Sequence, residues 1–232
     1  MMRRVLHTAC WAALVCGPAI GSQPRMGGEM NHVLVSVYQK TVYVSIERPW
    51  ELPLTLYDYG EVYDGPASVL NGSAYNGQFG WLANGFINLP GDARMWVEPV
   101  EQTDGLRTHA QSTFEPILGT DGSPALWEWN GTMVHNWTSA FTFGDYSATY
   151  RVFVGYADGT PYPGYTPGEV SLAWSYPCDA DFNGDTVINS LDFIAYLNAY
   201  IANDPKADFN GDTVINSLDF IAYLSAYVAG CP

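Results

Sequence analysis

Oxygen-bearing side chains recur at a fixed spacing near the end of this 232-residue chain. With Asp181 counted as position 1, donors stand at positions 1, 3, 5, 9 and 12, and the valine at position 7 offers its backbone carbonyl. The six residues are Asp181, Asn183, Asp185, Val187, Asn189 and Asp192. Calcium takes about six to eight oxygen ligands, and a loop curled around the ion presents alternate residues to it. The spacing therefore predicts a twelve-residue calcium loop.

The same loop occurs twice in the chain. Residues 180–197 read ADFNGDTVINSLDFIAYL, and residues 207–224 repeat these letters 27 positions later. Such identity indicates a duplicated supersecondary unit rather than a chance recurrence of a solvated polar turn. The equivalent donors in the second copy are Asp208, Asn210, Asp212, Val214, Asn216 and Asp219. Two Ca²⁺ ions are therefore expected.

Each loop runs into an apolar pattern that predicts a helix. Ser190 is expected to cap the first helix, with Asp192 in its first turn. Ile188 and Ile215, at loop position 8, are expected to pack the two loops against each other. The predicted buried faces consist of Phe193, Ile194, Leu197, Tyr200 and Ile201 in one copy and Phe220, Ile221, Leu224, Tyr227 and Val228 in the other. The two helices should then share one small core.

This loop and helix duplicate resembles a dockerin domain, of the bacterial subtype whose chain ends in a Gly-Cys pair. The resemblance rests on aspartate at position 12, Asn-Ser at positions 9 and 10, and the place of residues 178–232 at the end of the chain. It implies docking to a cohesin-like or other surface receptor through loop positions 10 and 11. These positions hold Ser190, Leu191, Ser217 and Leu218. Alternatively, the two leucines belong to the helix packing of the module itself.

Position 6 of each loop departs from the family pattern. Glycine is usual there because the backbone needs a positive φ, yet this chain has Thr186 and Thr213. A β-branched residue held in that region costs on the order of 1–3 kcal/mol. The substitution therefore predicts either weaker calcium binding or a different turn.

Two cysteines bracket the duplicated segment. Cys178 precedes the first loop, and Cys231 follows the second helix pattern. A two-fold arrangement of the copies would bring these ends together, so we expect a disulfide that contributes about 4 kcal/mol through loop entropy. The alternative is a free or intermolecular thiol.

The N-terminus has the order of residues of a secretory signal peptide, with cleavage expected after Gly21. Two arginines precede an apolar stretch over residues 5–20, and polar residues follow it. An uncleaved membrane anchor is the alternative, but about 16 apolar residues fall short of the roughly 20 that span a bilayer. The expected organisation is a signal peptide at 1–21, a β-sandwich domain with a linker at 22–177 and the calcium module at 178–232, in a secreted or cell-surface protein.

The chain is strongly acidic. It has 24 acidic and 9 basic residues, a formal net charge of −15, and loss of the two arginines of the signal leaves 24 against 7, or −17. Nucleic acids and anionic membranes repel such a surface, so neither is an expected partner. The mature chain is also expected to lack a transmembrane segment.

Residues 22–177 follow the alternation of β-strands. A hairpin is predicted over 33–46, and a second one, around an Asn-Gly turn, over 127–134. Two further strands are predicted over 150–156 and 170–176. We expect a mainly β fold, an antiparallel sandwich of about seven to nine strands that resembles immunoglobulin-like domains in pattern only, followed by the small all-α module.

No catalytic constellation is identified in the β-rich part. His32, His109 and His135 lack metal-ligand spacing and are interpreted as ordinary surface or strand residues. Signatures of serine nucleophiles and phosphate-binding loops are absent. Two acid pairs could supply the two carboxylates of a glycosidase, although solvated carboxylates are the simpler interpretation in an acidic chain. They are Glu98 with Glu101 and Glu115 with Glu128.

Aromatic residues offer another candidate site. Trp127 and Trp129 project from the same face of a strand, where they could stack on a sugar ring or fill the core. Core placement is favoured, because large aromatic side chains dominate such interiors.

Two functions remain. The favoured one is a secreted calcium-binding protein, not an enzyme, whose C-terminal module attaches the β-sandwich to a cell-surface or extracellular receptor. The alternative is a carbohydrate-binding or polysaccharide-degrading subunit that docks into a cohesin-type assembly. Exposed tryptophans or a cleft lined by carboxylates would favour the alternative.

Overall fold

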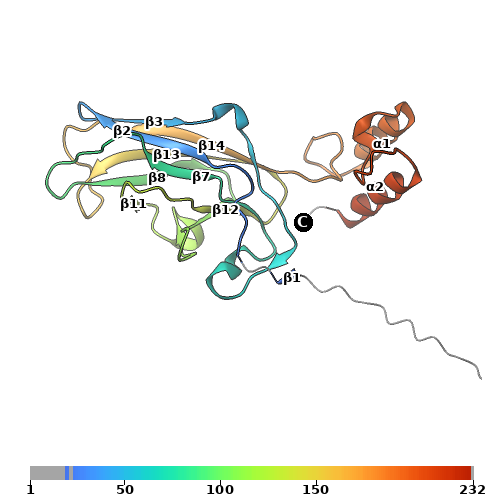
Figure 1. Cartoon of the computed structure of the whole chain (residues 1–232), viewed down its shortest axis with the longest axis horizontal. Coiled ribbons are helices and arrows are strands. Elements are labelled where there is room, and N and C mark those ends of the chain that lie inside the picture. The colour runs from blue at the N-terminus through green and yellow to red at the C-terminus, as the bar shows by residue number, and fades with distance from the viewer. Residues whose placement is uncertain (1–18, 21–22, 231–232) are drawn as a thin grey trace, which may run out of the picture.

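The computed structural model describes residues 19–20 and 23–230. These residues are mainly β, and two helices follow the last strand (Figure 1). The signal peptide predicted over 1–21 lies outside the described residues except for β1 (Ala19–Ile20), which pairs in parallel with β5 (Glu61–Val62). None of the helices in the described part of the chain has the length and apolar character needed to cross a membrane.

Three larger sheets make up the β-rich part. The five-stranded sheet has the order β11 (Trp127–Trp129), β8 (Arg94–Gln102), β13 (Gly144–Gly155), β14 (Gly168–Tyr176) and β4 (Leu54–Thr55). The three-stranded sheet has the order β3 (Thr41–Ile46), β2 (Asn31–Tyr38) and β7 (Phe79–Ala83). The four-stranded sheet has the order β10 (Pro116–Ile117), β9 (Arg107–His109), β12 (Trp137–Ala140) and β6 (Ala74–Asn76). Short 3-10 helices are η1 (Pro49–Glu51), η2 (Gly65–Leu70), η3 (Thr120–Gly122) and η4 (Pro205–Ala207).

One hydrophobic core joins the three-stranded and five-stranded sheets. Val33 and Val35 of β2 are fully buried, and they belong to the same cluster as Val97 of β8 and Val152 of β13. Along β2 the buried residues alternate with half-buried ones, as expected for a strand that packs one face on the core. The apolar alternation of the sequence is thus the cause of this packing.

The predicted hairpin over 33–46 is confirmed. β2 and β3 pair in antiparallel register, and the two turn residues Gln39 and Lys40 have φ values of 47° and 65°. Two consecutive positive φ values give a turn whose twist matches that of the strands. The strands predicted over 150–156 and 170–176 are also confirmed, because they lie in β13 and β14.

The prediction of an entirely antiparallel fold was wrong. β2 pairs in parallel with β7, and β14 pairs in parallel with β4. The β-rich part also contains more strands than expected, thirteen from β2 to β14, and several of them span only two or three residues. Short strands on the edges of sheets carry too little alternation to be recognised in a sequence.

The predicted hairpin over 127–134 was wrong as well. The Asn-Gly turn forms, with Asn130 Oδ1 accepting a hydrogen bond of 3.0 Å from the Thr132 amide. Trp129, however, pairs with Met95 of β8, and Val134 forms a bridge with Trp81 of β7. The two arms of the turn therefore join different sheets, which places Trp129 in the core.

The helices are α1 (Ser190–Ala202) and α2 (Ser217–Ala229), and they lie to one side of the sheets (Figure 1). Asn189 and Asn216 cap them, so the expectation of a cap at Ser190 was wrong by one residue. Asparagine is a preferred cap because its side-chain oxygen accepts a hydrogen bond from a free amide of the first turn. The capped helices begin where each loop ends.

The predicted buried faces of the helices were only partly right. Tyr196 and Tyr223 are fully buried, and Phe193, Tyr200, Phe220 and Tyr227 pack around them. Ile194, Ile201, Ile221 and Val228 were expected inside but are 51%, 80%, 57% and 77% exposed. Both helices are apolar on most sides, so the spacing alone did not determine which side faces inward.

Candidate metal centre

Three carboxylates of the first loop come together. Asp181, Asp185 and Asp192 each bring one oxygen to within 4.8 Å of those of the other two. The three residues stand at positions 1, 5 and 12 of the predicted loop. Like charges gathered this closely repel one another, and a bound cation would relieve that repulsion.

Asp181 folds the loop around its own carboxylate. Its Oδ1 accepts hydrogen bonds from the amides of Gly184 (3.0 Å) and Asp185 (3.1 Å), and its Oδ2 accepts one from Thr186 (2.7 Å). These bonds curl residues 181–186 into the tight turn that the spacing predicts. A carboxylate oxygen has further lone pairs, so it can accept these bonds and still contact a cation.

Both threonines at position 6 have a positive φ. The angle is 67° at Thr186 and 71° at Thr213, in the left-handed region that favours glycine. Of the two expectations for this position, a different turn is therefore wrong, and the loop keeps the conformation usually reserved for glycine. The remaining expectation, weaker calcium binding, stays a prediction.

Asp192 and Asp219 are fully buried at the starts of the two helices. Asp192 Oδ1 accepts from the Asn183 amide (3.2 Å), and Oδ2 accepts from the Asn189 amide (2.8 Å). Burial raises the pKa of Asp192, but these amides outweigh it and the pKa lies below its ordinary value. The pKa of Asp219 is likewise lowered. The hydrogen bond from the Asn216 amide is the largest cause, and burial, which raises the pKa, does not cancel it. Both carboxylates are therefore ionised at neutral pH, as a cation ligand requires.

The asparagines of the first loop have more local roles than predicted. Asn183 accepts a hydrogen bond from the Asp185 amide (2.8 Å) and donates to the Asp185 carboxylate (3.0 Å). Asn189 caps α1, because its side-chain oxygen accepts a hydrogen bond of 2.8 Å from the Leu191 amide. Its side-chain Nδ2 donates to the Val187 carbonyl (3.0 Å). The side-chain oxygens of Asn183 and Asn189 thus each accept one backbone hydrogen bond and keep a second lone pair for a cation.

The second loop repeats nearly the whole network. Asp208 accepts from the amides of Asp212 (3.1 Å) and Thr213 (2.8 Å), and Asp219 accepts from Asn210 (3.1 Å) and Asn216 (2.7 Å). Asn216 caps α2 and donates to the carbonyl of Val214 (2.9 Å). Within residues 23–230, however, only the first loop gathers three carboxylates within 4.8 Å. The two loops are equal in sequence but differ slightly in geometry.

The predicted partner residues lie on the surface. Ser190 and Ser217 are exposed, and Leu191 and Leu218 are 56% and 58% exposed. The alternative that the two leucines belong to the internal packing is therefore wrong. The predicted disulfide stays a prediction, because Cys231, the partner proposed for Cys178, lies outside the described residues.

Two of the four carboxylates that the sequence offers for glycosidase chemistry form ion pairs. Glu128 lies 2.7 Å from Arg94, and Glu98 pairs with Arg151 on the neighbouring strand β13. Glu101 and Glu115 are exposed. The structure therefore gives these acids the ordinary role of surface charges.

Trp127 and Trp129 both turn toward the core. Trp129 is 2% exposed and donates a hydrogen bond of 2.8 Å to the Thr132 carbonyl, and Trp127 packs against the same cluster. The centroid of the Trp81 ring lies 6.0 Å from that of Trp127 and 6.4 Å from that of Trp129. The preference for core placement over a sugar-stacking platform is confirmed.

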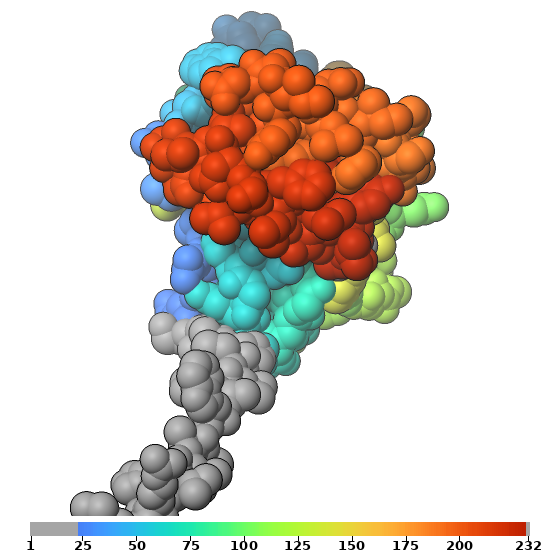
Figure 2. All heavy atoms as spheres, turned by 90° about the vertical axis from the view of Figure 1, so that its right-hand side faces the viewer, coloured from blue at the N-terminus to red at the C-terminus, as the bar shows by residue number. Residues whose placement is uncertain are grey.

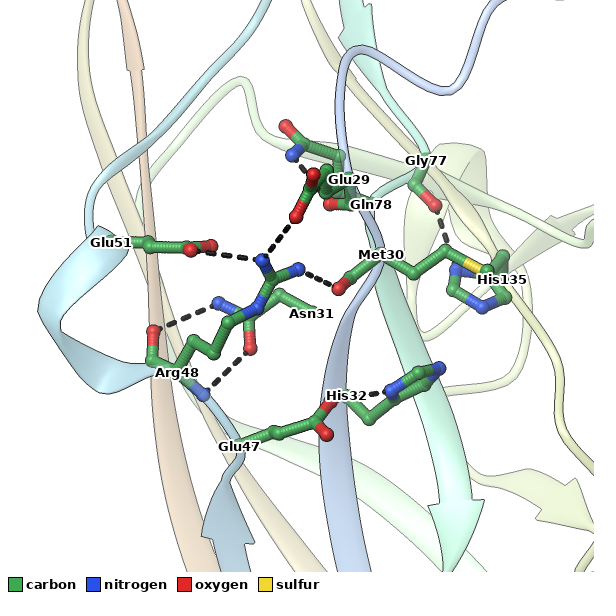
Figure 3. Close-up of polar contacts among 10 residues, drawn as sticks. All are labelled: Glu29, Met30, Asn31, His32, Glu47, Arg48, Glu51, Gly77, Gln78 and His135. Carbon is green, nitrogen blue, oxygen red and sulfur yellow. Dashed lines mark hydrogen bonds and ion pairs between the residues drawn. The ribbon is translucent and has the colours of Figure 1, made fainter.

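A polar cluster beside β2 was missed by sequence reasoning (Figure 3). The Arg48 guanidinium contacts the carboxylates of Glu29 (2.9 Å) and Glu51 (3.0 Å) and donates to the Met30 carbonyl. His32 and His135 lie next to it, with ring centroids 5.5 Å apart. The β2–β3 hairpin brings Arg48 to the start of β2. The parallel pairing of β2 with β7, together with the bridge between Trp81 and Val134, brings His135 to His32 from a distant part of the sequence.

The two histidines differ in their surroundings. His32 Nδ1 lies 2.6 Å from the Glu47 carboxylate, which is the main cause of a lowered Glu47 pKa. His135 is 2% exposed, and its burial lowers its pKa below the ordinary value, against the opposing effect of the bond to the Gly77 carbonyl. His135 is therefore neutral at neutral pH.

Comparisons of the chain with family models, with curated proteins and with solved structures find no match.

Proposed function

We propose that residues 178–232 form a dockerin-like calcium-binding module that attaches the β-rich part of a secreted protein to a cell-surface or extracellular receptor. The β-rich part is proposed to be a sandwich, because its three-stranded and five-stranded sheets share one core. The proposal names no catalytic activity.

The duplicated loop carries this proposal. Thr186 and Thr213 adopt the left-handed conformation in both copies, at a cost on the order of 1–3 kcal/mol each. A strained backbone persists where the surroundings require it, and here it curls the chain around Asp181 and Asp208. The gathering of Asp181, Asp185 and Asp192 supports a cation at the centre of that curl.

Calcium fits the donors in type. Carboxylates and a backbone carbonyl are hard oxygen ligands, and this set includes neither sulfur nor imidazole. A bound Ca²⁺ would offset two of the three negative charges and stabilise the folded module by RT ln(1 + [L]/Kd), about 2.7 kcal/mol at a hundredfold excess over Kd. A unit with so small a core needs such help.

The exposed residues of the helices support attachment to a protein. Apolar side chains that are more than half exposed gather on the loops and helices, namely Val187, Leu191, Ile194, Ile201, Val214, Leu218, Ile221 and Val228. Seen from the side of the helices, the segment forms the outermost layer of the molecule (Figure 2). Exposed apolar surface of this kind is typical of sites that bind another protein.

The Asp181→Ala, Asp208→Ala double variant tests the proposal. Isothermal titration of the full chain with Ca²⁺ should give two ions for the wild type, and the double variant should lose the heat of binding. Asp179→Ala is the matched control, because Asp179 is an exposed acid beside the first loop that is not a predicted ligand. Equal calcium binding by wild type and double variant would refute the proposal.

Receptor binding is tested separately. Leu191→Lys combined with Leu218→Lys should leave the calcium heat unchanged while reducing capture of the receptor, since both leucines are exposed and neither is a ligand. Capture by this variant at the wild-type level would exclude loop position 11 from the docking surface.

A further inference from the structure

Gly80 makes room for the ring of His135 beside His32. β2 and β7 run in parallel, and their register places His32 next to Gly80. A Cβ atom at Gly80 would lie 2.4 Å from both Cε1 and Nε2 of His135, so only glycine leaves space for that ring. The two imidazoles consequently meet edge to face, with planes 71° apart (Figure 3).

Each of these rings is held through its Nδ1 atom. His32 Nδ1 lies 2.6 Å from Glu47 Oε2, and His135 Nδ1 lies 2.9 Å from the Gly77 carbonyl oxygen. An ionised carboxylate and a carbonyl can only accept, so the hydrogen of each ring stands on Nδ1. In a neutral ring the lone pair is then on Nε2.

Both Nε2 atoms are buried and lack a hydrogen-bond partner among residues 23–230. Buried polar atoms nearly always have a partner, so two orphaned atoms on adjacent rings require an explanation. A histidine that binds a metal through one nitrogen typically donates its other N–H to a carboxylate or a backbone carbonyl. Glu47 and Gly77 supply one of each.

We infer that His32 and His135 bind one transition-metal ion through their Nε2 atoms, of the class that favours imidazole ligands. A surface hollow of about 670 Å³ lies beside His32, and its lining includes Met26, Glu29, Met30, Glu47 and Arg48. Glu29 in this lining is paired with Arg48 and Glu47 with His32, and the two methionine thioethers are soft ligands of the kind that suit copper(I). This site lies in the β-rich part and does not depend on the proposed calcium module.

Copper(II) is the most sensitive probe, because it binds nitrogen ligands more tightly than the other divalent ions of the first transition row. Tag-free full-length protein in excess Ca²⁺, which occupies acidic sites, is titrated with Cu²⁺ and examined by electron paramagnetic resonance. One ion per chain with hyperfine coupling to two imidazole nitrogens is expected. No high-affinity copper, or a signal without nitrogen coupling, overturns the inference.

Variants assign the donors. His32→Gln should weaken copper binding at least tenfold and remove coupling to one nitrogen, and His135→Gln should do the same if it folds. His32 is only partly buried and carries the test on its own, with circular dichroism as the check on folding. His109→Gln is the matched control and should bind copper as the wild type does. Wild-type affinity and coupling in His32→Gln would refute the site.

Glu47 is a positioning residue in this site. Glu47→Gln keeps both imidazoles but weakens the hydrogen bond to His32 Nδ1, and loss of such a partner costs about 10–100-fold in metal affinity. Two-nitrogen coupling should persist in this variant at reduced affinity. Unchanged affinity would show that Glu47 does not position the ring.

Discussion

Tyr196 and Tyr223, which occupy equivalent positions in the two copies of the repeat, stack face to face with ring centroids 4.0 Å apart and planes 8° from parallel. Both rings are fully buried, and Phe182 and Phe209 close the cluster with their edges toward the pair. The contact between the two helices is therefore centred on one residue from each copy, with Phe193 and Phe220 also in contact beside the pair. The two copies of the repeat thus contribute equivalent residues to one shared core.

Truncating one of these rings should unfold the helical segment. Tyr223→Ala removes a fully buried ring, and such changes cost about 3–5 kcal/mol, which is a large share of the stability of so small a core. Unfolding of the protein with and without Ca²⁺, followed by near-ultraviolet circular dichroism, would measure the loss of stability. Tyr223→Phe is the control, because it keeps the ring and removes a buried hydroxyl that lacks a partner among the described residues. A wild-type transition in Tyr223→Ala would contradict this view of the core.

Replacing the strained threonines with glycine should strengthen the loops. Thr186→Gly relieves a positive φ of 67°, which should gain about 1 kcal/mol, or about fivefold in calcium affinity. Calorimetric titration of full-length protein measures the change. Thr186→Ala is the control, because alanine also disfavours a positive φ, although less than a β-branched residue does. Weaker binding in Thr186→Gly would show that the threonine side chain supports the site.

The β-rich part should lose stability in mild acid through His109. Burial lowers the pKa of His109, with a smaller contribution from Arg107, whereas the unfolded chain titrates near 6.5. Because the unfolded state binds the proton first, the free energy of unfolding is highest above about pH 6.5 and falls as the pH drops below it. Urea unfolding at pH 7.5 and 5.0, followed by tryptophan fluorescence, would show the loss.

His109→Gln provides the comparison for that experiment. Glutamine does not titrate, so this variant should lose less stability between the two pH values than the wild type does. His135 also has a lowered pKa because of burial, so part of the pH dependence should remain. The same loss in both proteins would exclude His109 as a source.

The two tight turns and the helices that follow them could be predicted from the sequence, because both depend on residues close together in the chain. Ligand spacing, the repeat and the starts of the helices near Ser190 and Ser217 depend on residues a few positions apart. The buried side of each helix could not be predicted, since Ile194 and Tyr196 are both apolar and only the partner helix distinguishes them. The cap predicted at Ser190 was wrong by one residue because serine and asparagine both serve as caps and stand next to each other here.

The β-rich part was predicted where strands are long and adjacent in sequence. β2 and β3 share a two-residue turn. Buried residues alternate along the whole of β14 and along the first two thirds of β13. The parallel pairing of β2 with β7 joins segments more than 40 residues apart, so neither the mixed sheets nor the meeting of His32 with His135 could be foreseen. Long-range pairing depends on the packed core rather than on local alternation.

The pairing of β1 with β5 has a consequence for maturation. Cleavage after Gly21, as the sequence predicts, would remove Ala19–Ile20, the one strand that pairs with Glu61–Val62 in the part of the chain that the structure describes. The backbone amides and carbonyls of β5 would then stand as an open edge at the surface, and such an edge can accept an extended segment of another polypeptide. An uncovered edge at Glu61–Val62 is therefore expected only after the predicted cleavage.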